Sequence, residues 1–387
     1  MSAPDGRPRA RGLGLVLPGR PGPYGAITDV PGVEVGAVTL VSGDGPLVPG
    51  QGPVRTGVTA ILPRGRDGVG VPCAAGWYSL NGNGEMTGTT WIDEVGALSL
   101  PVTITNTHAV GSCHRGTIDW VVRDRPDLAA QWLLPVAAET WDGYLNDING
   151  SHVRAAHAVL ALDAARGGPV PEGSVGGGTG MSCYAFKGGS GTSSRLVEHA
   201  GTTYTVGVFL QANFGSRAEL TVTGVPLGAA LADDNPMETE PWLDADSARG
   251  PAGTGSCIAV VATDAPLLPG QCKALARRVP LGLARTGTSG SHFSGDVFVA
   301  FSTGNPGALA SRMPTSARAP ADAYDALRFV PWGWLDPFFA AVVEAVEEAV
   351  LNALVVNTDM VGRDGHRSPA LPRDRMVAAL AAAGRLR

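Results

Sequence analysis

The stretch GTGSCIAVVATDAPLL, residues 253–268, changes abruptly from small flexible residues to an apolar run. Residues 257–262 are rich in strand formers, which favour a buried strand, whereas the preceding Gly-Thr-Gly favours a loop. A single hydroxyl, that of Ser256, lies at the boundary between the two. Period-two alternation along a strand turns the neighbouring Cys257 to the opposite face, where we expect it to pack in the core.

Ser256 follows Gly255, and this order permits two interpretations. The ordinary one is a serine that begins a strand after a turn. The chemical one is a nucleophile whose hydroxyl attacks the unhindered carbonyl of Gly255, so that an N-to-O acyl shift cuts the chain. The cut would leave Ser256 with a free α-amine, whose pKa of about 7.7 to 8.0 suits a general base for its own hydroxyl. These residues alone leave both interpretations open.

A second polar pair precedes another apolar run, in HFSGDVFVAFSTGN at residues 292–305. Ser294 and Asp296 are two apart, so a strand would present both side chains on one face. The strand, helix and return that follow Ser256 would bring the two strand beginnings close together in one sheet. We therefore expect a hydroxyl and a carboxylate at the site of Ser256, although the SGD motif is also typical of an ordinary turn.

The composition of the 387-residue chain is that of a globular protein, since hydrophobic residues make up 44% of it. The 29 basic and 35 acidic residues give a formal net charge of -6, which argues against nucleic acid as a partner. Five cysteines without a CxxC pair favour reduced thiols in a cytoplasm over a disulfide framework. We expect a soluble cytoplasmic protein.

Strand and helix patterns alternate along the chain and predict an α/β or α+β layered fold. Residues 26–387 are expected to form a single catalytic domain, preceded by a disordered extension over residues 1–25. The most apolar segment contains Glu344, Glu347 and Glu348, which excludes a membrane span. Strands are expected at 33–41, 56–62, 99–105, 203–211, 257–262 and 297–302, and helices at 115–123, 153–165, 269–278 and 336–354.

One segment lacks any hydrophobic period. Residues 232–255 contain six acidic residues and three prolines, which predicts an exposed, mobile loop that ends directly at Ser256. Two glycine-rich stretches, at 80–89 and 174–195, lack the spacing of a nucleotide-binding loop. No HExxH or GxSxG motif is present, so neither a zinc protease nor an α/β-hydrolase is indicated, and we expect no metal and no cofactor.

Several blocks, taken together and in order, resemble the DmpA-type aminopeptidases, the family of D-aminopeptidases and β-peptidyl aminopeptidases. The resemblance extends from Ala26 to Leu371. The blocks are ITDVPGVEVG at 27, RTGVTAILPRG at 55, LNGNGEMTGTTWIDEVGALSLPVTITNTHAVG at 80, ETWDGYLNDING at 139, VGGGTGM at 175 followed by CYAFKGGSGTSSR at 183, GSCIAVVATDAPLLP at 255, SGDVFVAFSTGN at 294 and LNALVVNTDMVGRDG at 351.

This resemblance implies autocleavage between Gly255 and Ser256 into an α chain part, residues 26–255, and a β chain, residues 256–387. It also implies an αββα sandwich and a homo-oligomer, a tetramer of processed αβ pairs. The implied activity is that of an N-terminal nucleophile hydrolase, a serine aminopeptidase that releases the first amino acid from a small peptide, amide or ester. Ser256 would form the acyl-enzyme.

The resemblance implies roles for further residues. Ser294 and Asp296 match the family's second serine and acid. Asn213, in VGVFLQANFG, matches the asparagine that helps to form the oxyanion hole, a donor whose loss commonly costs about 10² to 10³ in rate. Glu139 stands where an acid receives the ammonium group of the substrate.

One position departs from the family pattern. Where many members have a tyrosine that assists the oxyanion, this chain has Trp141, and Tyr144 lies three residues further on. An indole N–H can donate a hydrogen bond but cannot exchange a proton as a phenol can. Both residues are therefore candidates.

Two other functions stay open at this stage. Acetyltransferases that act on acetylornithine share the fold and cleave themselves, but they use threonine where this chain has Ser256. An unprocessed, inactive scaffold or binding protein on the same fold is the other alternative. The sequence does not distinguish an L-peptide, a D-alanyl amide or ester, and a β-peptide as the preferred substrate, because such choices depend on small differences in pocket shape.

Overall fold

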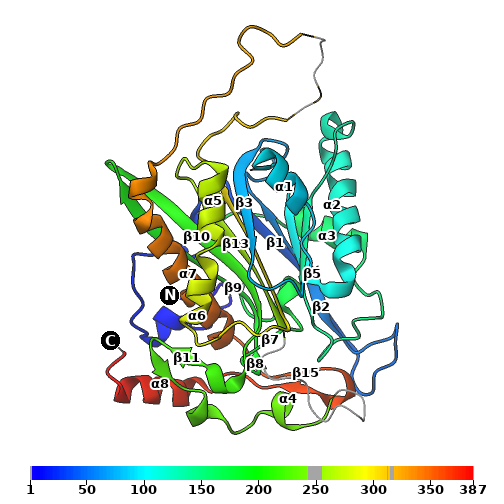
Figure 1. Cartoon of the computed structure of the whole chain (residues 1–387). Helices are drawn as coiled ribbons and strands as arrows, with labels where there is room; N and C mark the ends of the chain where they lie inside the picture. Colours follow the sequence, from blue (N-terminus) through cyan, green and yellow to red (C-terminus); the bar gives the residue numbers. More distant parts are fainter. Residues whose placement is uncertain (1, 243–254, 312, 314–317, 387) are drawn as a thin grey trace.

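The structure is a computed structural model that describes residues 2–242, 255–311, 313 and 318–386. Two β-sheets lie face to face between two layers of helices (Figure 1). One sheet has four strands and the other has six. The layer order, helix, sheet, sheet and helix, confirms the predicted αββα sandwich.

Helices cover the outer face of the four-stranded sheet. Its strands are β1 (Glu34–Ser42), β2 (Val54–Leu62), β5 (Val102–Asn106) and β6 (Val136–Thr140), in that order, and the helices are α2 (Val110–Asp124) and α3 (Ala155–Asp163). Strands β1, β2 and β5 pair antiparallel, whereas β5 and β6 run parallel. Val58 and Leu62 of β2 pack on this side against Trp120 of α2 and Leu162 of α3.

The six-stranded sheet carries the residues singled out by the sequence. Its strands, in spatial order, are β4 (Ala97–Leu98), β3 (Cys73–Ser79), β14 (Ser294–Ser302), β13 (Gly255–Thr263), β10 (Thr202–Asn213) and β9 (Gly189–His199). The helices on its outer face are α5 (Pro269–Ala276), α6 (Val279–Ala284) and α7 (Asp336–Val355). β13 lies in the middle, antiparallel to β10 and parallel to β14. The first residues of β13 and β14 therefore lie next to each other at the same end of the sheet.

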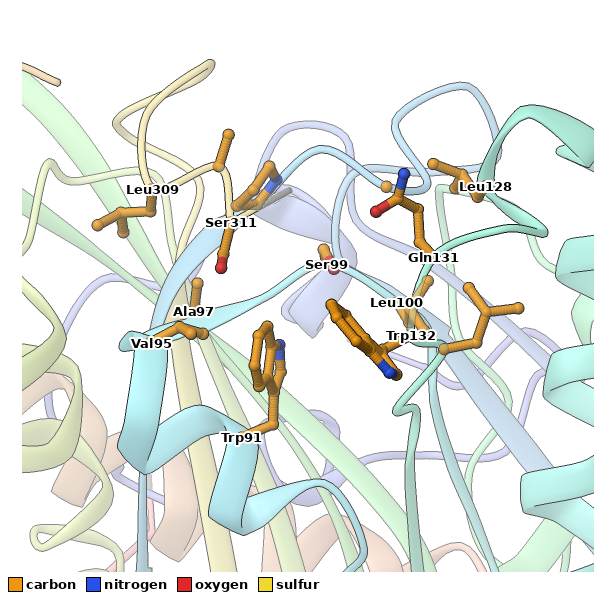
Figure 2. A pocket seen from close by; sticks show the side chains of 14 residues that line it. Trp91, Val95, Ala97, Ser99, Leu100, Leu128, Gln131, Trp132, Leu309 and Ser311 are labelled. Atoms are coloured by element: carbon orange, nitrogen blue, oxygen red, sulfur yellow. The ribbon is translucent and has the colours of Figure 1, made fainter. Parts of the chain in front are cut away.

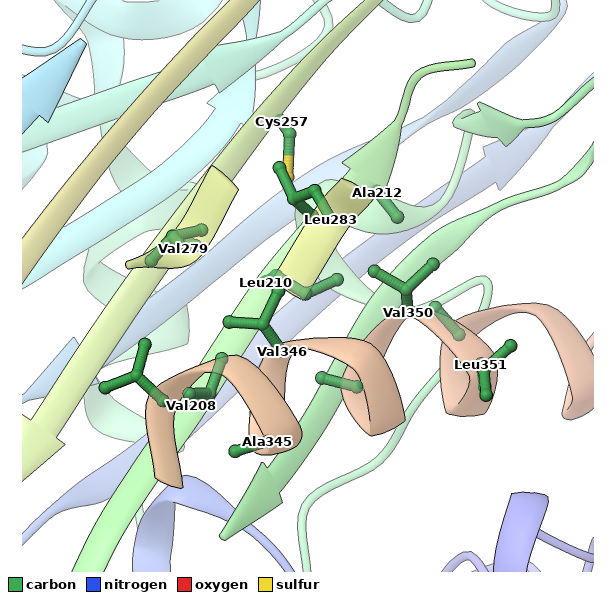
Figure 3. Packing of buried hydrophobic residues seen from close by; sticks show 14 of the residues in the cluster. Val208, Leu210, Ala212, Cys257, Val279, Leu283, Ala345, Val346, Val350 and Leu351 are labelled. Atoms are coloured by element: carbon green, nitrogen blue, oxygen red, sulfur yellow. The ribbon is translucent and has the colours of Figure 1, made fainter. Parts of the chain in front are cut away.

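The side chains of β13 alternate between two core layers, one on each face of the six-stranded sheet. Ile258 and Val260 pack in the layer between the two sheets. Cys257 and Ala259 face the helices, where α7 lies across the sheet with its apolar stripe inward (Figure 3). The prediction that Cys257 is a core residue is confirmed, and burial raises the pKa of its thiol well above the usual value.

The remaining described elements are short. They are the helices α1 (Thr89–Val95), α4 (Pro236–Thr239) and α8 (Arg373–Ala382), the strands β7 (Ser182–Cys183), β8 (Phe186–Lys187), β11 (Thr221–Val222), β12 (Val225–Pro226), β15 (Met360–Val361) and β16 (Arg367–Ser368), and several 3-10 turns. Among the described helices, none combines the length and the apolarity that a bilayer crossing requires.

The predicted disordered extension over residues 1–25 is wrong for the residues that the structure describes. Leu15 and Leu17 are buried in the same cluster as α7. Arg9 is buried as well, and its guanidinium donates to the carbonyl oxygens of Gly25 and Thr192, both at 2.7 Å. The apolar run at residues 13–17 is short and interrupted by Gly14, so it gave no helix or strand signal, yet Leu15 and Leu17 pack in this core.

Removing the Arg9 side chain should destabilise the whole domain, because Arg9 forms a buried ion pair with Glu172 at 2.7 Å. We expect Arg9→Ala to lower the free energy of unfolding by about 3 to 5 kcal/mol, since the carboxylate of Glu172 would stay buried without its partner. Arg20→Ala is the control, because Arg20 pairs with Glu198 on the exposed surface and should contribute less than about 1 kcal/mol. Urea unfolding followed by circular dichroism measures both; equal losses would contradict the prediction.

Candidate active site

Ser256 is the second residue of β13 and is held between two neighbouring strands. It pairs with Asn213 of β10 on one side and with Gly295 of β14 on the other. Its hydroxyl is almost fully buried, and its Oγ accepts a hydrogen bond from the backbone N–H of Trp141 at 3.2 Å. A Cβ at Gly255 would overlap the carbonyl oxygen of Asn213. Only glycine therefore fits directly before the serine.

The side-chain amide of Asn213 has a fixed orientation beside this hydroxyl. Its Oδ1 accepts the backbone N–H of Ser182 at 2.8 Å, and its Nδ2 donates to the carbonyl oxygen of Trp141, also at 2.8 Å. An amide nitrogen has two hydrogens, so the second N–H of Asn213 is still available. Because paired residues of adjacent strands share a face, Asn213 and Ser256 point to the same side of the sheet.

Both residues line a cavity of about 300 Å³. Its polar side includes Ser182 and the carboxylate of Glu139. Among the described residues that line it, Glu139 is the only charged one. The apolar wall consists of Trp141, Tyr144, Met237, Trp242 and Phe293. The cavity thus presents one acid, a few hydrogen-bond donors and a large apolar surface.

Glu139 lies near the end of β6 and is nearly inaccessible to solvent. Its Oε1 accepts the backbone N–H of Glu85 at 2.8 Å, and the hydroxyl of Thr107 donates to its Oε2. Burial nevertheless raises the pKa of Glu139 above the usual value of a glutamate, because two neutral donors do not replace full hydration. A bound cation would restore the preference for the charged form.

The turn-rich stretch LNGNGEMTGT, which carries no motif of its own, closes one side of the cavity. Asn83 lies in the lining, and Glu85 supplies the N–H that binds Glu139. The stretch passes directly over Gly295, where a Cβ would overlap the carbonyl oxygen of Asn83. Gly295 pairs with Ser256, so the missing side chain at this position lets the loop approach the site. Sequence reasoning missed these residues, because turn composition alone does not indicate where a loop lies.

Ser294 and Asp296 interact with each other, as their spacing suggests. The hydroxyl of Ser294 donates to Oδ1 of Asp296 at 2.7 Å, and Asn81 donates to Oδ2 at 3.0 Å. Burial raises the pKa of this carboxyl, which these hydrogen bonds partly offset.

The register corrects one part of the prediction for this pair. Asp296 pairs with Cys257 and Ser294 with Gly255, so both side chains lie on the opposite face of the sheet from the Ser256 hydroxyl. Side chains alternate between the two faces along each strand, so the face on which Ser294 and Asp296 lie relative to Ser256 depends on the register between β13 and β14. The spacing of residues in the sequence does not determine that register. The pair therefore flanks the main chain at residue 256 and not its side chain.

Trp141 and Tyr144, the two candidates for a donor, have different surroundings. The hydroxyl of Tyr144 donates to the carbonyl oxygen of Arg367 at 3.2 Å, and burial raises its pKa to about 12. The ring of Tyr144 stacks on His366 and meets the edge of Trp242 at 5.1 Å. Trp141 contacts Ser256 through its backbone N–H, and its indole ring lies 5.8 Å from Trp242.

The segment predicted as an exposed loop, residues 232–255, is in part ordered. Residues 236–239 form α4, and Trp242 donates from its indole N–H to the carbonyl oxygen of Met237 at 2.8 Å. Both of these side chains belong to the apolar wall. Acidic composition suggested solvent exposure, but the few apolar residues in the segment face the cavity. The rest of the predicted loop, residues 243–254, lies outside the described residues.

A second, smaller pocket of about 70 Å³ lies between the loop after α2 and the end of α1 (Figure 2). Trp91 and Trp132 lie on opposite sides of it, with leucine side chains around them. None of its described lining residues is ionisable, so it offers no group for acid–base or nucleophilic chemistry. Within the described part of the chain, no group of three or more His, Cys, Asp or Glu side chains is arranged to hold a metal ion.

Residues 25–368 match the sequence profile of peptidase family S58. The chain belongs to this family. It is 46% identical over 375 residues to the β-peptidyl aminopeptidase BapA of Sphingosinicella microcystinivorans, a match that covers 96% of this chain and 92% of that protein. It is 44% identical over 374 residues to the protein of the same name from Sphingosinicella xenopeptidilytica.

Solved structures give the same result. One is the L-aminopeptidase D-Ala-esterase/amidase from Ochrobactrum anthropi, a prototype of the serine aminopeptidases and a variant of the Ntn hydrolase fold. Its TM-score is 0.87 at 44% sequence identity, and the match covers 98% of this chain and 100% of that chain. A β-aminopeptidase from Burkholderia sp. has a TM-score of 0.84 and 44% identity over 97% of this chain and 99% of that one. The predicted DmpA-type family and fold are confirmed, and the chain is an aminopeptidase.

The close approach at Gly295 can be tested directly. We expect Gly295→Ala to displace the Asn83–Glu85 loop and to lower kcat/KM about 10- to 100-fold, because forcing a methyl group into a packed contact commonly costs about 1 to 3 kcal/mol. Gly82→Ala in the same loop is the matched control, since a Cβ there would meet nothing within 4 Å. Steady-state kinetics on an amino-acid p-nitroanilide measures both. Full activity in Gly295→Ala would show that the loop position is unimportant.

Proposed function

We propose that this chain is a self-processing serine aminopeptidase in which Ser256 becomes both the nucleophile and the new amino terminus. The single observation that carries the proposal is the placement of Ser256. Its hydroxyl points into a cavity that also holds Asn213 and the buried carboxylate of Glu139. The residue before it, Gly255, sits where no side chain fits.

Processing would begin with attack of the Ser256 Oγ on the carbonyl carbon of Gly255. The peptide C–N bond breaks as the ester forms, and the nitrogen of Ser256 takes up the hydroxyl proton. Water then hydrolyses the ester, which leaves a carboxylate on Gly255 and restores the hydroxyl beside a free α-amine. The products are residues 1–255 and residues 256–387.

Turnover would use the same hydroxyl on the substrate. Glu139 receives the substrate's ammonium group and places its first carbonyl near Ser256. The α-amine of Ser256 takes the proton from Oγ during attack, and it returns a proton to the leaving amine. The backbone N–H of Trp141 and the second N–H of Asn213 stabilise the oxyanion. Water then releases the amino acid from the acyl-enzyme.

Ser294 and Asp296 would act on the α-amine and not on the hydroxyl. They pair with Gly255 and Cys257, the two neighbours of Ser256, so they flank the main-chain nitrogen that becomes the amine. A buried carboxylate near this nitrogen would orient the amine and stabilise the ammonium group that forms once the amine has taken the proton from Oγ. Tyr144 would contribute to the wall, since its hydroxyl is bound to Arg367.

The substrate would be a small peptide, an amide or an ester with a free ammonium group and an apolar first residue. Glu139 matches the ammonium group, and the aromatic wall matches an apolar side chain. The described lining contains no cation that would select a free carboxylate at the far end of the substrate.

We further propose a cytoplasmic homo-oligomer. The five cysteines are buried and unbridged, which suits a reducing compartment. Described residues of the connection from β14 to α7 project from the domain (Figure 1), and several of them are exposed aromatic side chains. Tyr324 is 90% exposed, Trp332 56% and Trp334 64%, and aromatic residues in such positions are typical of subunit interfaces.

Ser256→Ala tests the function. We expect a single full-length band on a denaturing gel and a fall in kcat/KM of at least about 10⁴, because both bond cleavages need the hydroxyl. The wild type should give two bands that separate at residue 255. Ser289→Ala, an exposed serine outside the cavity lining, should be processed and active. Aminopeptidase activity from an intact Ser256→Ala chain would refute the proposal, and a wild type that stays whole and inactive would favour a scaffold.

Glu139→Gln tests the ammonium site. Losing one charge-assisted hydrogen bond should lower kcat/KM about 10- to 100-fold, mainly through KM. Because burial raises the pKa of Glu139, the wild type should lose affinity as the pH falls through that raised pKa, and the glutamine variant should lack this acidic limb. Glu94→Gln, on the exposed face of α1, is the control. An identical pH dependence of KM in both enzymes would contradict the role.

A further inference from the structure

The hairpin of β7 and β8 supports Asn213 from the side opposite to Trp141. Ser182 pairs with Lys187 across this hairpin, and Cys183 pairs with Phe186. The backbone N–H of Ser182 is the group that binds Oδ1 of Asn213. The orientation of the oxyanion donor therefore depends on where the base of the hairpin lies.

The tip of the hairpin has an unusual backbone that a buried cation holds in place. Tyr184 and Ala185 have φ values of 53° and 54°, a left-handed conformation that costs a residue with a side chain some free energy. Arg217 donates to both of their carbonyl oxygens, at 2.9 and 2.6 Å. Its guanidinium also lies 3.3 Å from the ring centroid of Phe186.

A second buried cation holds the base of the hairpin. Lys187 is 0% exposed, and its Nζ donates to the carbonyl oxygens of Met181 at 2.7 Å and Gly188 at 2.8 Å. These two residues are the ones that enter and leave the hairpin. No carboxylate of the described residues forms an ion pair with this amine, and burial lowers its pKa to about 7. An amine that binds only main-chain carbonyls fixes the path of the backbone.

The choice of lysine at this position is itself informative. Only two of the 29 basic residues in the chain are lysines, Lys187 and Lys273. Lys273 is half exposed and pairs with Asp93 at 3.4 Å on the surface. Unlike the guanidinium of Arg217, the compact amine of Lys187 can lose its proton on burial.

We propose that Lys187 is a positioning residue for Asn213. Its amine bridges the carbonyl oxygens of Met181 and Gly188 and so fixes the position of the Ser182 N–H between them. This N–H in turn fixes the rotation of the Asn213 side-chain amide toward the oxyanion. Lys187 itself touches no substrate. The proposal rests on the function proposed above.

The test is a double-mutant cycle on the processed enzyme. Lys187→Met keeps the length of the side chain and removes the donors. It should lower kcat about tenfold, with KM changed by less than about twofold, because the loss affects only the transition state. In the Asn213→Ala background the same substitution should change kcat by less than about twofold, since the donor that it orients is gone. Lys273→Met is the matched control and should behave as the wild type.

The outcomes separate this inference from the function on which it rests. Wild-type enzyme that is inactive would refute the function; active wild type in which the effects of Lys187→Met and Asn213→Ala multiply would refute the role of Lys187 alone. Rates are expressed per processed β chain, so that slower cleavage does not imitate a lower kcat. Lys187→Gln, which retains a shorter donor, replaces Lys187→Met if the latter does not fold. Loss of the folded protein in both variants would assign Lys187 to stability alone and overturn the proposal.

Discussion

The backbone contact between the first residue of β13 and the last residue of β10 is the constraint on which the site depends. Gly255 lies against the carbonyl oxygen of Asn213, closer than any side chain would permit. This contact fixes Ser256 opposite Asn213 in the ladder and turns both side chains to the layer between the sheets. A shift of one residue would turn the serine toward the helices, where Cys257 now lies.

Three buried polar side chains near this contact have defined hydrogen-bond partners. The carboxylate of Glu139 accepts hydrogen bonds from a backbone N–H and a hydroxyl, and that of Asp296 accepts them from Ser294 and Asn81. The amine of Lys187 donates to two main-chain carbonyl oxygens. Leaving such groups unpaired in a dry interior would cost several kcal/mol each, so their hydrogen bonds restrict the loops that supply them. The hydrogen bonds of its buried polar groups therefore hold the site in place, in addition to the pairing of its strands.

Much of the architecture could be predicted from periodicity. β1, β2, β13 and α7 were expected within a few residues of their observed bounds, since each carries a regular apolar pattern. The N-terminal segment and the wall residue Trp242 could not be predicted in this way. Their apolar residues lie in stretches too short to show a period, and they become buried only through contact with distant parts of the chain.

The candidate site shows the same division between local and non-local information. The position of Ser256 at a strand beginning follows from neighbouring residues, and so does the hydrogen bond between Ser294 and Asp296. The face on which each side chain lies depends on the register between β13 and β14, which no local pattern specifies. The backbone N–H of Trp141 has no sequence signature at all, because every residue except proline has such a group.

The register also explains how one strand beginning can serve two chemical steps. The hydroxyl of Ser256 faces the cavity, whereas its nitrogen lies in the plane of the sheet, close to the pair on the other face. Before cleavage this nitrogen belongs to a peptide bond and cannot act as a base. In the proposed mechanism, cleavage would turn the same nitrogen into an amine flanked by the strand positions of Ser294 and Asp296. Conversion from precursor to enzyme would then need little movement beyond the departure of Gly255 from its contact with Asn213.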